Sequence, residues 1–136
     1  MTGFPGAREF PQGTRTAQDA AAAIGCAVGQ IVKSLVFVRD GRPVLVLCSG
    51  ANQVDEAALG LSKADAALVR ETTGFAIGGV PPYGHPAPLE TLVDEDLLAY
   101  DEVWAAAGTP RSVFPLAPAE LVERSGGTVV AVSPGR

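Results

Sequence analysis

The sequence predicts a mixed α/β domain of the α+β class, with a mixed β-sheet flanked by helices. Residues 31–38 and 43–48 are rich in β-branched side chains and are joined through Asp40-Gly41, a pair typical of a tight hairpin turn. Both stretches are apolar almost throughout, which indicates strands covered on both faces. Because the hairpin is antiparallel and the other strand and helix patterns show no regular βαβ repeat, a mixed sheet is expected.

The length and composition of the chain fit one globular domain. Its 136 residues are 47% hydrophobic and 18% charged, values that are typical of a folded chain and not of a disordered one. Residues 1–13 hold two prolines and three glycines without periodicity. We therefore expect an irregular N-terminal lead-in over these residues and a single domain over residues 14–136.

The elements before the centre of the chain are predicted from capping and breaking residues. Thr16 is a suitable N-cap for a helix over residues 17–24, and Gly25 ends that helix. A loop at residues 49–53 follows the hairpin. Two short helices are expected after this loop. The first covers residues 54–61, and the second covers residues 63–71 with Ser62 as its N-cap.

The C-terminal half alternates between short strands and helical segments. The expected strands are apolar and cover residues 89–93, 102–106, 113–116 and 128–132. A helical turn is expected at residues 94–98 and a bend at residues 108–110. Pro118 near its start and Gly126 after its end bound a last helix, which runs to about Arg124.

The charge and the cysteines limit the partners and the location of the chain. A formal net charge of −5 leaves no broad basic face for binding duplexes, so DNA is not an expected partner and any RNA contact must be local or assisted. Neither a membrane span nor a signal peptide is expected. Cys26 and Cys48 are predicted to be buried free thiols, which suits a reducing cytoplasm.

The stretch from residue 75 to residue 85 is the least ordinary in the chain. It combines Gly78-Gly79 with Pro81-Pro82 and ends at His85, the only histidine. Because glycines permit close approach of the backbone and prolines fix it, a rigid non-helical bend is expected. Such a bend either aims amide N–H groups into a concavity that binds an anion or an oxyanion, or is an ordinary tight connection.

Lys33 interrupts the first apolar strand. A buried ammonium group is costly unless it reaches solvent or an anion. Lys33 is therefore either a lysine whose head reaches solvent or a lysine held for the phosphate or carboxylate of a ligand.

The catalytic motifs that can be recognised from spacing are absent. The sequence has no metal-binding motif, Walker loop, dinucleotide fingerprint or nucleophile elbow. The acidic residues Asp94 and Asp96 are interpreted as a helix start rather than as a catalytic pair. If the chain is an enzyme, it works through positioning and main-chain electrostatics, without a metal or a cofactor.

The order of these features resembles the YbaK family, free-standing relatives of the editing domain inserted in bacterial prolyl-tRNA synthetase. The matching features are Lys33 followed by Ser34, the Gly-x-x-x-Pro signature at residues 78–82, and a glycine bend at Gly108. The resemblance covers roughly residues 16–132. It implies a mostly antiparallel mixed sheet and hydrolysis of the ester between a wrong amino acid and the 3′ adenosine of a tRNA, with the tRNA-Pro class as the expected substrate.

The resemblance also implies roles for individual residues. Gly78 and Gly79 would offer amides to the substrate carbonyl as it becomes tetrahedral, and Lys33 would anchor the terminal nucleotide. Water, or a hydroxyl or thiol of the substrate, would replace a protein base. The implied substrate-binding residues are Ser34, Val80, Pro81, Pro82, Tyr83, His85, Ala106 and Gly108. The expected partners are the acceptor end of a mischarged tRNA and a synthetase such as prolyl-tRNA synthetase.

The chain departs from the cysteine-specific YbaK proteins at the second glycine bend. Those proteins carry a serine and an aspartate where this chain has Ala106 and Val113, so a less polar pocket is expected and a cysteinyl substrate is not implied. His85 would orient water, bind a small polar side chain, or only cap the loop. A non-catalytic module that binds aminoacyl-tRNA or a synthetase, and a hydrolase for another small ester, are the alternative functions.

Overall fold

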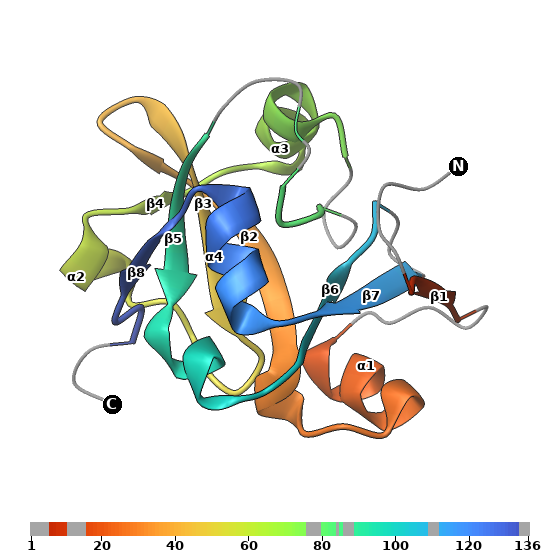
Figure 1. Cartoon of the computed structure of the whole chain (residues 1–136). Helices are drawn as coiled ribbons and strands as arrows, with labels where there is room; N and C mark the ends of the chain where they lie inside the picture. Colours follow the sequence, from red (N-terminus) through yellow and green to blue (C-terminus); the bar gives the residue numbers. More distant parts are fainter. Residues whose placement is uncertain are drawn as a thin grey trace.

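The computed structural model describes residues 6–10, 16–75, 80–83, 85, 89–108 and 112–133, and it has a mixed α/β fold (Figure 1). The helical elements are α1 (Ala17–Ile24), η1 (Val28–Gln30), α2 (Glu56–Leu59), α3 (Ala66–Thr73), η2 (Glu95–Ala99) and α4 (Pro118–Ser125). The strands are β1 (Arg8–Glu9), β2 (Ile31–Arg39), β3 (Arg42–Ser49), β4 (Ser62–Lys63), β5 (Glu90–Asp94), β6 (Val103–Ala106), β7 (Ser112–Leu116) and β8 (Thr128–Val130). None of the helices in these ranges is long and apolar enough to span a bilayer.

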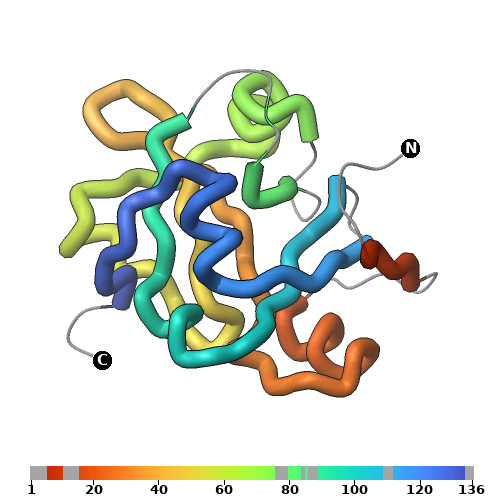
Figure 2. Tube along the Cα trace, in the orientation of Figure 1, coloured from red at the N-terminus to blue at the C-terminus, as the bar shows by residue number. Residues whose placement is uncertain are grey.

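The described strands form one mixed sheet in the order β1-β7-β6-β2-β3-β5-β8, and β4 pairs with β2 outside this path. The β1–β7, β6–β7, β2–β3 and β2–β4 pairs are antiparallel, and the β2–β6, β3–β5 and β5–β8 pairs are parallel. Strands from the two halves of the chain are thus interleaved, with β2 and β3 between β6 and β5, as the colours in Figure 2 show. The predicted mixed sheet is confirmed.

Side chains that alternate along the central hairpin fill both faces of the sheet. Leu45 and Leu47 pack in one cluster with Leu121 of α4, whereas Val44 and Val46 belong to a second cluster that includes residues next to α2. A third cluster lies against α1 and contains Ala20, Ala21, Ile31, Trp104 and Val113. Side chains thus pack on both faces of the sheet, as its apolar strands predict, and α4 lies in front of β2 and β3 in Figure 1.

The first helix and the hairpin turn agree with the sequence prediction. Thr16 Oγ1 accepts a hydrogen bond from the amide of Asp19 at 3.0 Å, and Gly25 ends α1 with φ 86°. Asp40 and Gly41 form the turn between β2 and β3 with φ values of 53° and 76°. Positive φ at both central residues is what a tight hairpin turn of this twist requires.

The two helix starts predicted at residues 54 and 63 are wrong. Asp55 is the N-cap of α2, and its side chain accepts a hydrogen bond from the amide of Ala58. Asp65 caps α3 in the same way, while Ser62 lies in β4. An aspartate and a serine are almost equally good N-caps, so the sequence alone does not decide between them.

The short strands are the other difference from the prediction. β1 lies in the lead-in that was expected to be irregular, and β4 lies where a helix start was expected. Each has two residues, too few to show the alternation by which a strand is recognised. β8 also ends at Val130, earlier than the predicted residue 132.

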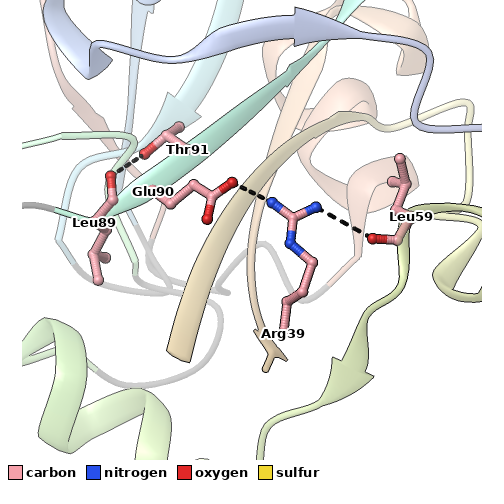
Figure 3. Close-up of polar contacts among 5 residues, drawn as sticks. All are labelled: Arg39, Leu59, Leu89, Glu90 and Thr91. Atoms are coloured by element: carbon pink, nitrogen blue, oxygen red, sulfur yellow. Dashed lines mark hydrogen bonds and ion pairs between the residues drawn. The ribbon is translucent and has the colours of Figure 1, made fainter. Parts of the chain in front are cut away.

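Arg39 ties the far end of the hairpin to two neighbouring elements (Figure 3). Its Nη1 donates to the main-chain oxygen of Leu59 at 3.3 Å, and its Nη2 forms an ion pair with Glu90 of β5. Next to this pair, Thr91 Oγ1 donates to the main-chain oxygen of Leu89 at 3.0 Å. Because both charged side chains are partly exposed, the ion pair adds little stability and serves mainly to fix the start of β5 beside the hairpin.

Gly50, directly after β3, is a position where the fold has no room for a side chain. An added Cβ would overlap the main-chain oxygen of Val28 and lie 2.8 Å from Ala17 Cβ. We expect Gly50→Ala to lower the free energy of unfolding by about 1–3 kcal/mol. Urea titration followed by the fluorescence of Trp104, the only tryptophan, measures this loss.

Gly41→Ala is the matched control, because a Cβ at Gly41 meets no atom within 4 Å and the cost arises from its φ of 76° alone. That cost should be about 1 kcal/mol. A loss for Gly50→Ala no larger than the loss for Gly41→Ala would contradict the close packing of α1 on the loop after β3.

Candidate functional site

The strands beside β2 leave part of its outer edge unpaired. β6 pairs with Ile31 and Val32, and β4 pairs with Phe37 and Val38. Between these pairings no described strand pairs with the outer edge of residues 33–36, and β6 diverges from β2 in Figure 1. The first three residues of this segment are only half-buried, whereas the residues on either side of them are buried. We call residues 33–36 with their unpaired edge the β2 gap.

A cavity of about 800 Å³ lies along the β2 gap. Its walls come from the start of α1, β2, the loop after β3, β4, α3 and β6. The volume lies within the range of small-molecule binding sites. Among the residues that line it are Lys33, Ser34, Val69, Val80, Ala106 and Val113.

The charge of the cavity is opposite to that of the chain. Lys33 and Lys63, the only two lysines in the sequence, both line it, while Glu56 is the one acidic residue in its described lining. The chain as a whole carries a net charge of −5. The local positive charge of the cavity favours a ligand with an anionic group there. The negative net charge of the chain disfavours the binding of polyanions elsewhere on the surface.

The ammonium group of Lys33 is held at the cavity by the loop after β3. Its Nζ donates to the main-chain oxygen of Asn52 at 2.6 Å. The side chain of Asn52 is fixed in turn, because its Nδ2 donates to Asp94 Oδ2 at 2.9 Å and to Asp96 Oδ2 at 2.8 Å. An ammonium group has three donors, so this arrangement orients Lys33 and leaves two donors for a ligand.

Asp94 is the anchor of this network. Its side chain is almost fully buried, with 1% of the residue exposed, and its Oδ2 also accepts a hydrogen bond from the amide of Ser49 at 2.9 Å. Its Oδ1 accepts from the amide of Asp96 at 3.0 Å, which is the helix-start role predicted from the sequence. The contacts to Ser49 and Asn52 span 45 and 42 residues and arise from the parallel pairing of β3 with β5, so local spacing gives no sign of them.

The two cysteines are free, but only Cys48 is fully buried. Burial raises the pKa of the Cys48 thiol to about 12, although the charge of Lys33 opposes the shift. Cys26 is half-buried, which differs from the prediction, and partial burial raises its pKa as well. Neither thiol is thus activated as a nucleophile. In the described part of the chain, no three His, Cys, Asp or Glu side chains are grouped to hold a metal.

Four of the predicted site residues meet at the cavity. Lys33, Ser34, Val80 and Ala106 all line it. Ser34 Oγ is buried and has no hydrogen-bond partner among the described atoms. Gly78 and Gly79, the predicted oxyanion-binding residues, lie outside the described residues.

Three further predicted residues do not contribute to the cavity lining. Pro81 and Pro82 are buried, and Tyr83 packs edge-on against Phe114 with ring centroids 6.0 Å apart. The guanidinium carbon of Arg124 lies 6.0 Å from the centre of the Tyr83 ring. Burial raises the pKa of the Tyr83 hydroxyl. Tyr83 therefore packs against residues of β7 and α4 and does not line the cavity.

His85 and Gly108 support the loop rather than the cavity lining. The Nε2 of His85 donates to the main-chain oxygen of Pro81 at 2.7 Å, which fits the loop-capping alternative, and its ring centre is 6.2 Å from that of Phe75. Gly108 has φ 104°, and a Cβ there would lie 3.3 Å from Phe75 Cε1. The glycine bend thus approaches Phe75, the first residue of the loop, and its positive φ favours glycine.

The residues missed by sequence reasoning are Asn52, Lys63 and Val69, together with Asp94 as a residue of the site. Lys63 was expected at the start of a helix, and in the structure it lies in β4 and lines the cavity. Asn52 lies in a loop without periodicity. A buried strand followed directly by a polar loop is the only sequence signal that points to Asn52.

Comparisons with known proteins find similar chains over most of the sequence. Residues 11–123 match a family described as aminoacyl-tRNA editing domain. YwhH of Bacillus subtilis strain 168, whose function is uncharacterised, is 33% identical over 127 residues, which are 86% of this chain and 79% of YwhH. A proline--tRNA ligase of Lactobacillus helveticus strain DPC 4571 is 34% identical over 86 residues, 58% of this chain but only 15% of the ligase.

A crystal structure of a candidate trans-editing enzyme for prolyl tRNA synthetase is also similar. It superposes with a TM-score of 0.88 and 51% sequence identity, and the match covers 95% of this chain and 86% of the other. At that identity the two chains share both their fold and most of their length.

The Asp94 network predicts a difference between two isosteric substitutions. Asp94→Asn would place its amide group against a donor in either orientation, namely the amide of Asp96, or the amide of Ser49 together with Nδ2 of Asn52, and should lower the free energy of unfolding by about 1–3 kcal/mol. Asp96→Asn can turn its oxygen toward Asn52 and should cost less than about 1 kcal/mol. Chemical denaturation of both variants measures the difference, and equal losses would contradict the anchoring role of Asp94.

Proposed function

The chain belongs to the aminoacyl-tRNA editing domain family, and from this premise we propose that it is a trans-acting deacylase that hydrolyses the ester of mischarged tRNA, with the tRNA-Pro class as its substrate. The observation that carries the proposal is the cavity along the β2 gap, where Lys33 is held by a hydrogen bond to the main-chain oxygen of Asn52. A synthetase pocket cannot strongly reject a smaller or isosteric side chain, so a second hydrolytic site has a clear purpose.

Lys33 binds the phosphate of the terminal nucleotide in this proposal. The ammonium group of Lys33 is oriented by its hydrogen bond to the main-chain oxygen of Asn52. The loop that contains Asn52 is itself fixed by the hydrogen bond between the Asn52 side chain and Asp94. Among the described residues, the hydrogen-bond partner of Lys33 is a neutral carbonyl and no carboxylate forms an ion pair with it, so an arriving phosphate can form a charge-assisted hydrogen bond. This choice of partner supports a ligand-binding lysine over a lysine that only reaches solvent.

The amides of Gly78 and Gly79 stabilise the tetrahedral intermediate of the ester in this proposal. Oriented main-chain N–H groups stabilise an oxyanion because they are placed before its charge develops. Water attacks the carbonyl carbon, and a hydroxyl or thiol of the substrate takes the place of a protein base in orienting it. The ester bond then breaks, and the ribose oxygen leaves with the proton from the water. No protein base is invoked, which agrees with the raised thiol pKa values and with His85 donating to the loop.

The apolar lining of the cavity favours a small uncharged acyl group. Val69, Val80, Ala106 and Val113 contribute short hydrocarbon side chains and no hydrogen-bonding groups. These four walls distinguish ligands by size, while the polar side chain of Ser34, whose hydroxyl has no described partner, lines the same cavity. We expect the acceptor end to enter alone, because the net charge of −5 disfavours a broad contact with the body of a tRNA. A synthetase bound to the same tRNA is the expected partner.

The proposal is tested by a panel of tRNAs carrying matched and mismatched amino acids. At least one tRNA-Pro with a small non-cognate amino acid should lose its ester about tenfold or more faster than in buffer, and prolyl-tRNA-Pro should be spared. Acid-gel separation of charged and uncharged tRNA follows the reaction. If every ester decays at its spontaneous rate while an aminoacyl-adenosine analogue still binds, the chain is an accessory binding module. If only free aminoacyl esters are cleaved, it is a hydrolase of another class.

The role of Lys33 is tested by Lys33→Ala, which should lower kcat/KM for the best ester by about tenfold or more because an oriented charged hydrogen bond is lost. Arg42→Ala is the control, since Arg42 lies in the same hairpin, carries the same charge and is exposed. Both variants should melt close to the parent protein. Turnover of Lys33→Ala at the parental rate would remove Lys33 from the site.

A further inference from the structure

The hydrogen bonds between β2 and β3 show which N–H and C=O groups of the β2 gap point toward β3 and which point away from it. The amide of Gly50 donates to the main-chain oxygen of Ile31 at 2.7 Å, whereas the amide of Ser49, opposite Val32, donates to Asp94 instead. In an antiparallel pair, residues that bond to the partner strand alternate with residues that do not. Ile31 bonds toward β3, so residues 32, 34 and 36 direct their N–H and C=O groups to the outer edge.

The carbonyl of Ser34 and the amide of Val36 therefore face the cavity side by side. No described strand pairs with this part of the edge, because β6 stops pairing at Val32 and β4 begins at Phe37. Main-chain groups that are left unpaired beside apolar walls need a hydrogen-bonding partner. The edge thus offers one acceptor and one donor, separated by a single residue, to whatever occupies the cavity.

The size of the gap limits what can use this edge. A peptide strand added to a sheet needs a free edge along which it can extend. Here β6 and β4 occupy the same edge on both sides, so only four residues are open. A compact flat group fits this length better than a strand does.

The pairing edge of adenine carries an amino donor at N6 next to an acceptor at N1, which complements a carbonyl and an amide on one strand edge. The proposed function supplies the identity of the base, because the ester of a charged tRNA is on its terminal adenosine. Val69 and Val80, 4% and 2% exposed, and Ala106 are apolar walls of the same cavity against which a ring can pack.

We propose that the β2 gap holds the terminal adenine of the substrate by its pairing edge. The carbonyl of Ser34 accepts a hydrogen bond from the N6 amino group, and the amide of Val36 donates to N1. Lys33, the neighbour of Ser34, then lies beside the nucleotide and can reach its phosphate. This inference rests on the proposed function for the identity of the ligand, and it assigns the base to a strand edge and not to a side chain.

The test uses acceptor-stem RNA hairpins that end in adenosine analogues and carry the same ester. Purine riboside lacks the N6 amino group, 1-deazaadenosine lacks the N1 acceptor, and 7-deazaadenosine keeps both and is the matched control. We expect kcat/KM to fall by about tenfold for each of the first two, because each leaves a buried main-chain group unmatched. The 7-deaza substrate should react within about twofold of adenosine, since its pairing edge is unchanged. Equal rates for all four substrates would overturn the inference and leave the deacylase proposal standing.

A binding measurement separates the inference from the proposed function. If the adenosine substrate itself is not hydrolysed, the deacylase proposal fails, and titration of ¹⁵N-labelled protein with adenosine 5′-monophosphate decides the inference. A shift of the Val36 amide with this nucleotide, absent with its 1-deaza analogue, supports the strand-edge contact. Identical responses to the two nucleotides, or none at Val36, overturn it.

A pair of variants tests the protein side of the same contact. Val36→Pro removes the amide that faces the gap without removing a bond to β3, and Val36→Ala shortens the side chain but keeps the amide. The ratio of rates for adenosine and 1-deazaadenosine should fall to about one in Val36→Pro and stay near tenfold in Val36→Ala. A preserved ratio in a folded Val36→Pro protein contradicts the proposal. If that variant does not fold, the analogue series decides.

Discussion

The unpaired edge of β2 is the constraint on which the rest of the site depends. A strand at the centre of a sheet normally has partners on both sides, because free main-chain groups are costly. Here β6 leaves β2 after Val32 and β4 joins it only at Phe37, and the cavity lies along the segment between them. The same interruption that weakens the sheet thus creates room for a ligand next to Lys33.

The network around Asp94 fixes the other side of the site. That carboxylate is buried and fully used, since its oxygens accept from the amides of Ser49 and Asp96 and from the side chain of Asn52. The network fixes the loop that holds Lys33. A rigid loop on one side of the cavity and a rigid strand on the other give the site a defined shape before any ligand arrives.

Much of the fold follows from local sequence, while much of the site does not. The hairpin and α1 were predictable because Asp40-Gly41, Thr16 and Gly25 act on their immediate neighbours. Lys33 was also identifiable, because an ammonium group in an apolar strand is costly unless it reaches solvent or binds an anion. Asn52 and Asp94 were not, since they meet only through the register of β3 on β5. The oxyanion role of Gly78 and Gly79 still rests on the family resemblance.

The central claim is that an aminoacylated adenosine binds along the β2 gap with its phosphate on Lys33. The most direct measurement is a crystal structure of the protein with an amide-linked aminoacyl-adenosine 5′-phosphate, which cannot be hydrolysed. The account predicts that the ligand lies between β4 and β6, with a phosphate oxygen about 3 Å from Lys33 Nζ. A ligand bound on another surface, or in the cavity with its phosphate directed away from Lys33, would contradict it.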